Sequence, residues 1–473
     1  MKFSISNILN ILLKVFLFLL PWQTIWIYRE SFLGGVKWEY GTLGFYATEI
    51  LLWIIVVVFM IWYIKKFRVQ SSKFKVRVTK DRVFLFSVLC LISYAIISAF
   101  WASDRDLAWQ QGLRILEMFL LFFVLYLGPV DFKLTVKWLV LGAIIPSLLG
   151  IWQFLTQTTF ASTLFGLAVH PAWQSGTSII ASETIGRWLR AYGPFSHPNV
   201  FGGYLVIVLW LSLRGGARAT TKQSPGDLEK IKNINLLGIA SSADANRLPR
   251  NDMFFYLTSY VLCLTCLFFT FSRSAWLALL IGLVVLCWRN LSQPGKACLP
   301  ARQGWGLFLI MPVVLFSLLS FIFFPLLQTR TSNSTISETR SITERTTGYR
   351  EAWQMIKQNP VLGVGAGNYT VALWRMDKWR PVWELQPVHN VLLLFIAELG
   401  FVGVGLFLLV ILTFFSFQLT DSKYQLRCYL LSVICILPLL LFDHYLYSSY
   451  FGLMLSTVFF ALFLKSDTQS LPS

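Results

Sequence analysis

The chain has 473 residues, and its composition excludes a soluble fold. Hydrophobic residues make up 56% of the chain and charged residues 13%, whereas a globular protein carries about 25% charged residues. The same balance excludes a disordered chain and a secreted disulfide scaffold. The formal net charge is +18, but Lys and Arg collect in the cytoplasmic loops of membrane proteins. The charge is therefore no argument for a nucleic-acid partner.

Apolar segments of about 20 residues recur along the chain, and this length crosses a hydrocarbon core of about 30 Å. We therefore predict an all-α, polytopic integral membrane protein with about 12 transmembrane helices. The predicted spans are residues 8–28, 42–64, 83–101, 107–127, 134–155, 199–213, 253–271, 274–288, 305–327, 389–417, 427–443 and 447–464. The first is expected to be a retained span, because no small-residue cleavage site follows it.

Basic loops predict the orientation. Residues 65–82, 214–252 and 289–304 are rich in Lys and Arg and fall on one side together with both termini, which the positive-inside rule places in the cytoplasm. The loop 214–252 has the Gly, Ser and Pro content of a flexible linker. The expected division is 1–155, N-terminal transmembrane helices; 156–198, an external segment; 199–327, transmembrane helices with the linker; 328–388, a large external loop; and 389–473, C-terminal transmembrane helices with a short cytoplasmic tail.

The large external loop is polar from Thr329 to Thr347 and structured after that. Its apolar side chains then repeat at helical spacing, at Tyr349, Ala352, Trp353 and Ile356. Because Pro360 ends this pattern, we predict a short interfacial helix whose aromatic face lies on the membrane. The loop is also rich in Arg, which the positive-inside rule does not explain for a long external segment. An anionic partner on the outer side would explain it.

Three alternate glycines, Gly363, Gly365 and Gly367, follow this helix. They leave the backbone free either to approach a ligand or to turn tightly, and the pattern lacks the Lys of a nucleotide-binding P-loop. Further along, Glu398 lies nine residues after His389, or roughly 13 Å deeper in a helix. We expect Glu398 to be a buried carboxyl that is hydrogen-bonded between helices.

Chemistry at the outer face is indicated by histidines and arginines. In the predicted topology all four histidines lie there: His170, His197, His389 and His444. His389 stands at the water boundary before a span, and an imidazole with a pKa near 6.5 can accept a proton. Arg273 lies in a short outer turn without an acidic neighbour in sequence. Its guanidinium suits a phosphate or pyrophosphate, although snorkelling to lipid headgroups is the alternative. No histidine pair has the spacing of a helical metal site, so we expect no metal.

Four short blocks in this order resemble the O-antigen ligase and polymerase superfamily of bacterial membrane glycosyltransferases. The blocks are Tyr192 to Asn199; Phe271 to Trp276; Arg350 to Trp353 with Asn359-Pro360 and Gly363 to Tyr369; and His389-Asn390 with Glu398-Leu399-Gly400. The resemblance covers about residues 190–405. The first five predicted spans agree with the superfamily only in number.

The resemblance implies a glycan donor on undecaprenyl pyrophosphate, presented at the outer leaflet of the bacterial cytoplasmic (inner) membrane. An acceptor hydroxyl of a glycan, lipid or protein would displace the lipid pyrophosphate, without a metal or other cofactor. By analogy His389 is the general base, and Arg273 and Arg350 hold the pyrophosphate. Relatives often carry the loop arginine four residues before the tryptophan, where this chain has Tyr349. The implied pyrophosphate set is therefore Arg273, Arg345, Arg350 and Arg190, and the implied lining is His197, Asn199, Asn390, Asp443 and His444.

Several functions stay open at this point. An O-antigen ligase, a polysaccharide polymerase and a protein O-oligosaccharyltransferase share the blocks and differ in the acceptor. A flippase for lipid-linked oligosaccharides would predict paired halves and charges near the bilayer midplane. A non-catalytic scaffold would leave the implied site residues apart. Convergence of Arg273, Arg350 and His389 on one outward cavity would favour the transferase.

Overall fold

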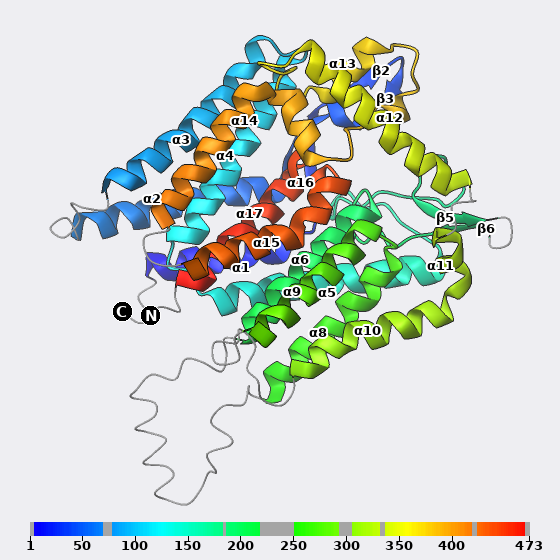
Figure 1. Ribbon diagram of the computed structural model, residues 1–473, viewed down its shortest axis with the longest axis horizontal. Helices are drawn as coiled ribbons and strands as arrows, with labels where there is room; N and C mark the ends of the chain where they lie inside the picture. The colour runs from blue at the N-terminus through cyan, green and yellow to red at the C-terminus, as the bar shows by residue number, and fades with distance from the viewer. Residues whose placement is uncertain are drawn as a thin grey trace, which may run out of the picture.

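The computed structural model describes residues 4–69, 78–182, 186–217, 250–292, 305–331, 336–418 and 423–468. This part of the chain is mostly α-helical, as predicted, and Figure 1 shows helices packed side by side in one body. The helices are α1 (Ile5–Leu19), α2 (Ala47–Val69), α3 (Val78–Ile97), α4 (Arg105–Leu127), α5 (Phe132–Thr156), α6 (Pro198–Ala217), α8 (Arg250–Phe269), α9 (Arg273–Ser292), α10 (Trp305–Ile322), α11 (Phe324–Thr331), α12 (Ile336–Gln358), α13 (Tyr369–Met376), α14 (Val391–Gln418), α15 (Lys423–Phe442), α16 (Tyr445–Ser448) and α17 (Tyr450–Thr468). The fold is that of an all-α membrane protein.

Five of the described helices are long and apolar enough to cross a membrane: Ala47–Lys66, Arg82–Phe100, Arg105–Leu127, Phe132–Thr156 and Val391–Ser416. The bent pair α10 and α11 passes the same test when taken together. Shorter apolar helices are Ile5–Leu19, Pro198–Leu213, Phe254–Phe269, Arg273–Trp288, Val433–Phe442 and Tyr450–Leu464. The predicted total of about 12 crossings stays a prediction.

The first two predicted spans are wrong at the ends that face each other. Helix α1 ends at Leu19, before Pro21, and the chain continues as strand β1 (Ile25–Arg29). This strand pairs antiparallel with β4 (Leu43–Tyr46), which directly precedes α2. Hydropathy alone is compatible with a membrane helix at Ile25-Trp26-Ile27-Tyr28, because all four residues are apolar or aromatic. Their β-branched and aromatic side chains favour a strand instead. A second hairpin, β2 (Phe32–Leu33) with β3 (Val36–Lys37), completes the connection.

The predicted span 305–327 is bent and consists of two helices. Leu309–Ile322 and Phe324–Arg330 meet at an angle of 95°. The break falls at Phe323, two residues before Pro325. Proline lacks the backbone N–H and restricts the residue before it, so a helix ends here and a new one begins with proline in its first turn.

The external helix is longer than predicted and faces the protein. Helix α12 runs from Ile336 to Gln358, so most of the polar stretch thought to precede it is helical. Ala352 is fully buried and Ile356 is 3% exposed, because this face packs against α14. Trp353 is 55% exposed on another face. Ala352 and Ile356 therefore face the protein and not a membrane surface, as had been predicted for them, and a contact of Trp353 with the membrane stays a prediction. The predicted end of the helix before Pro360 is confirmed.

The glycine-rich segment turns tightly against a break in α14. Gly363 has φ +72° and Gly400, inside α14, has φ +61°. The N–H groups of Val364 and Gly365 donate to the carbonyl oxygens of Ala397 (3.0 Å) and Glu398 (2.9 Å). The two backbones approach so closely that a Cβ on either glycine would overlap a carbonyl oxygen of the other segment. Of the two roles left open for the glycines, the tight turn is the one observed.

Glu398 is buried at this break, as expected from its sequence position. Its Oε2 accepts hydrogen bonds from the Gly367 N–H (2.9 Å) and from the Tyr447 hydroxyl (3.0 Å). Tyr447 belongs to α16, so the carboxyl connects the glycine-rich segment with the C-terminal helices. Glu398 therefore holds α14 in place at its break.

We expect Gly363→Ala and Gly400→Ala each to destabilise the protein by about 2–4 kcal/mol, because a side chain adds both backbone strain and overlap. The matched control is Gly405→Ala in the same helix, where no described atom lies within 4 Å of an added Cβ. That change should be neutral or stabilise by up to about 1 kcal/mol through helix propensity. Thermal unfolding of the detergent-purified variants measures the difference. Equal stability of Gly400→Ala and Gly405→Ala would contradict the tight-turn assignment.

The helix ends that lead into the basic loops lie at the left and bottom of Figure 1, whereas α13 lies at the top and α12 runs along the upper right. The loops themselves fall largely outside the described residues, at 70–77, 218–249 and 293–304, and this includes most of the linker 214–252. Their cytoplasmic location and the domain boundaries therefore stay predictions.

Candidate active site

Arg190 is a buried arginine that follows the hairpin of β5 (Ile179–Ser182) and β6 (Gly186–Leu189). Its side chain is embedded, with the residue 3% exposed. Nε donates to the Thr270 carbonyl oxygen (2.6 Å), Nη1 to Ser178 Oγ (2.5 Å) and Nη2 to Asn199 Oδ1 (2.8 Å). A buried charge is tolerated only with such partners. Arg190 thus joins the segment between α5 and α6 to the α8–α9 turn and to the start of α6.

Asp443 is a second buried charge and lies where α15 ends. Asn199 Nδ2 donates to its Oδ1 (3.0 Å), and Ser274 Oγ donates to its Oδ2 (2.7 Å). Asn199 lies in the first turn of α6, and Ser274 in the first turn of α9. The carboxylate therefore connects the first two sequence blocks with the C-terminal helices.

His389, His197 and His444 gather beside this carboxylate. The ring centroids of His389 and His444 are 5.2 Å apart, and His444 Nδ1 is 2.7 Å from Ser448 Oγ. His197 Nδ1 accepts a hydrogen bond from the Asn199 N–H (3.1 Å). His389 Nδ1 is buried and has no hydrogen-bond partner in the described structure. The described protein therefore leaves the hydrogen-bonding capacity of this imidazole nitrogen unused.

Burial lowers the pKa of His389, because it penalises the charged imidazolium. Asp443 and Glu344 oppose this effect, and Arg345 adds to it. Burial also lowers the pKa of His197, and the neighbouring charges of Arg190 and Arg330 act in the same direction. The imidazoles are therefore neutral near pH 7, as a general base must be.

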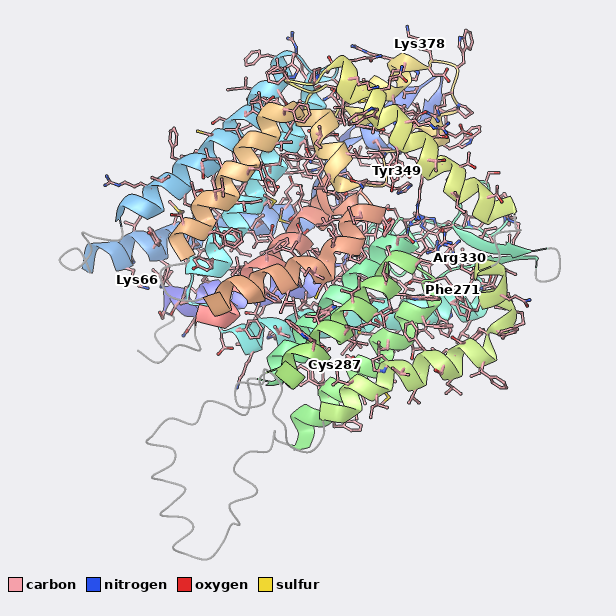
Figure 2. All side chains as sticks on the ribbon, viewed as in Figure 1. Lys66, Phe271, Cys287, Arg330, Tyr349 and Lys378 are labelled. Atoms are coloured by element: carbon pink, nitrogen blue, oxygen red, sulfur yellow. The ribbon has the colours of Figure 1, made fainter. Side chains whose placement is uncertain are left out.

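The predicted arginines differ in how exposed they are and in which groups they act on. Arg345 acts electrostatically on His389, whereas Arg350 is exposed on another face of α12. Arg273 is the half-buried first residue of α9, next to the Ser274 that contacts Asp443. Arg330, at the end of α11 and labelled in Figure 2, acts on His197. Arg330 was not among the predicted site residues, and the bend between α10 and α11 gives it this position.

Asn390 has a structural role at the start of α14. Its Oδ1 accepts a hydrogen bond from the Leu393 N–H (3.0 Å), which caps the helix, and its Nδ2 donates to the Leu441 carbonyl oxygen (3.3 Å). The Tyr349 hydroxyl donates to the same oxygen (3.4 Å). These contacts hold α12 and the histidine-bearing turn against the end of α15.

His389 also lies on the wall of a cavity of about 550 Å³. The wall consists of Thr339, Thr343, Glu344, Thr347, Gly348 and Glu351 of α12, and of Arg380, Glu384, Gln386, Pro387, Val388 and His389 of the segment that leads into α14. Arg380 Nη1 donates to Glu351 Oε1 (2.6 Å). His389 is therefore shared between the polar cluster around Asp443 and a cavity large enough for a small molecule.

His170, the fourth predicted outer histidine, does not join this group. Its ring stacks on Tyr192 with centroids 4.1 Å apart, and burial lowers its pKa to about 4. Within the described ranges, no three or more His, Cys, Asp or Glu side chains are arranged to hold a metal ion.

Fold and site together define a helical membrane protein with histidines and arginines gathered where its helices end. Residues 258–408 match the model of the O-Antigen ligase family. This part of the chain contains Arg273, α12 and His389, and the match supports the O-antigen ligase superfamily, so the predicted resemblance is confirmed. The superfamily consists of O-antigen ligase- and polymerase-type membrane glycosyltransferases. No curated protein matches the chain.

Proposed function

We propose that this protein transfers a glycan from undecaprenyl pyrophosphate to an acceptor hydroxyl at the outer face of the bacterial cytoplasmic membrane. One observation carries the proposal. The segment that matches the family supplies His389, which lines a cavity and is acted on electrostatically by Asp443 and Arg345. A base and cations at one place are what a displacement of pyrophosphate requires.

In the proposed reaction, His389 takes the proton of the acceptor hydroxyl. The acceptor oxygen then forms a bond to the anomeric carbon of the first sugar, and the bond from that carbon to the phosphate oxygen breaks. Undecaprenyl pyrophosphate leaves with the electron pair. The lowered pKa keeps His389 neutral before the step, and Asp443 stabilises the imidazolium that forms.

Arginines are proposed to bind the donor pyrophosphate. Arg273 suits this role because it begins α9, where the helix dipole also favours an anion. Arg345 suits it because it acts on His389. Arg190 has three of its donor groups bonded within the protein, so we assign it to holding Asn199 and the α8–α9 turn in position.

The expected result with purified protein, an undecaprenyl-pyrophosphate glycan and a panel of acceptors is transfer that continues in the presence of a metal chelator. A labelled lipid or protein would identify a ligase, and a lengthened glycan would identify the polymerase alternative. Movement of the donor across proteoliposomes without any new glycosidic bond would instead identify a flippase and contradict the proposal. The gathering of the site groups around helix ends favours the transferase over a transporter.

A further inference from the structure

The charged groups that line the cavity beside His389 are mainly negative, whereas the arginines near the histidines are positively charged. Its lining includes three carboxylates, Glu344, Glu351 and Glu384, and one guanidinium, Arg380. Arg380 pairs with Glu351 at 2.6 Å and approaches Glu384 at 3.6 Å. A pyrophosphate would be repelled from such a wall. The donor phosphates are therefore expected to bind at the arginines, and the cavity is available for the acceptor.

The remaining wall offers hydroxyl groups in a row. Thr339, Thr343 and Thr347 are spaced four residues apart on α12, so they lie on one face of the helix. Thr343 Oγ1 donates to the Thr339 carbonyl oxygen (2.9 Å), which leaves its lone pairs available for a donor. Hydroxyls and carboxylates together accept and orient the many O–H groups of a sugar.

We propose that this cavity binds the acceptor sugar and selects a neutral or amino sugar over an acidic one. The inference rests on the proposed transfer and names its acceptor class. His389 lies on the same wall, so a hydroxyl of the bound sugar reaches the base from the cavity. A uronic acid would bring its carboxylate against Glu351 and Glu384, whereas an ammonium group would be attracted. The volume of about 550 Å³ lies in the range of roughly 300–1,000 Å³ for small-molecule sites.

Binding to the full-length protein tests this inference without turnover. Methyl glycosides of glucose, glucosamine and glucuronic acid are compared by saturation-transfer NMR in detergent. We expect glucosamine and glucose to bind at least tenfold more tightly than glucuronate. Glu384→Gln should reduce the ratio of glucosamine to glucuronate affinity by roughly tenfold, because one wall charge is removed. Absence of binding by all three, or a preference for glucuronate, would overturn the inference.

A matched pair on α12 tests the hydroxyl row. Thr343→Val removes a hydroxyl that lines the cavity, and Thr346→Val removes one that does not line it but makes the same kind of bond to the backbone. We expect Thr343→Val to raise the acceptor KM about tenfold with the donor KM unchanged, and Thr346→Val to change neither. A raised donor KM would place the donor in the cavity and overturn the inference. These outcomes concern only the acceptor site. Absence of transfer by the wild-type protein would instead refute the proposed function.

Discussion

His389→Ala should reduce glycan transfer by about 10²–10⁴-fold, because the acceptor hydroxyl would lose its general base. The residue is not needed to build the site: Asp443 keeps its hydrogen bonds from Asn199 and Ser274, and Asn390 still caps α14. The loss should therefore fall on kcat, with a normal donor KM. Thermal unfolding and size-exclusion chromatography of the variant check that folding is intact. Normal transfer by a folded His389→Ala protein would remove His389 from the mechanism.

The pH profile of the wild-type protein provides a second readout for this histidine. Burial lowers the pKa of His389 below its ordinary value near 6.5, and Arg345 adds to the effect, while Asp443 and Glu344 act against it. The imidazole then stays neutral to a lower pH than a free histidine. Activity should thus be constant through pH 6.5 and fall only as the pH drops through the lowered pKa. Arg345→Gln should move this acidic limb to a higher pH. An acidic limb above pH 7 would contradict the assignment.

Arg345→Ala should reduce transfer by about 10²-fold, whereas Arg350→Ala should leave most of the activity. The two side chains belong to different faces of α12. Arg345 acts electrostatically on His389, whereas Arg350 is exposed on another face. The two variants remove the same charge from neighbouring positions, so each controls for the other. Steady-state kinetics with varied donor concentration separates the effect on kcat from that on the donor KM.

Replacement by lysine distinguishes geometry from charge at the same position. A bidentate guanidinium matches a phosphate with two parallel hydrogen bonds, and an ammonium does not. Arg345→Lys and Arg273→Lys should therefore recover little of the lost activity. Full recovery would indicate that only the positive charge matters. If Arg350→Ala abolished transfer while Arg345→Ala did not, the loop arginine inferred from the family motif would be the correct one.

The site depends on contacts between residues far apart in sequence. Arg190, Asn199, Ser274 and Asp443 form one hydrogen-bonded chain, which joins the segment between α5 and α6, the starts of α6 and α9 and the end of α15. Since both charges are buried, removing either would leave the other polar groups without partners. The cluster thus couples the stability of the helix ends to the position of the histidines.

Much of this arrangement could be predicted from residues that act locally. Apolar blocks of membrane-spanning length determined the all-α class, because a backbone in lipid must satisfy its own hydrogen bonds. Pro360 determined where α12 ends, and the motif around His389 and Arg273 determined the superfamily. The same local reasoning was wrong where hydropathy does not distinguish a strand from a helix, as at Ile25–Arg29, and it did not predict the bend before Pro325.

Only the tertiary structure decided which charged groups meet. The sequence places Arg345 and Arg350 five residues apart on one helix, and only the packing of Ala352 and Ile356 against α14 decides which of them faces the histidines. It also decided that carboxylates line the cavity while most of the arginines lie elsewhere. The physical reason is that hydropathy and helical periodicity are properties of neighbouring residues. The field at His389 is instead a sum over side chains from several helices, and their distances exist only once the helices have packed.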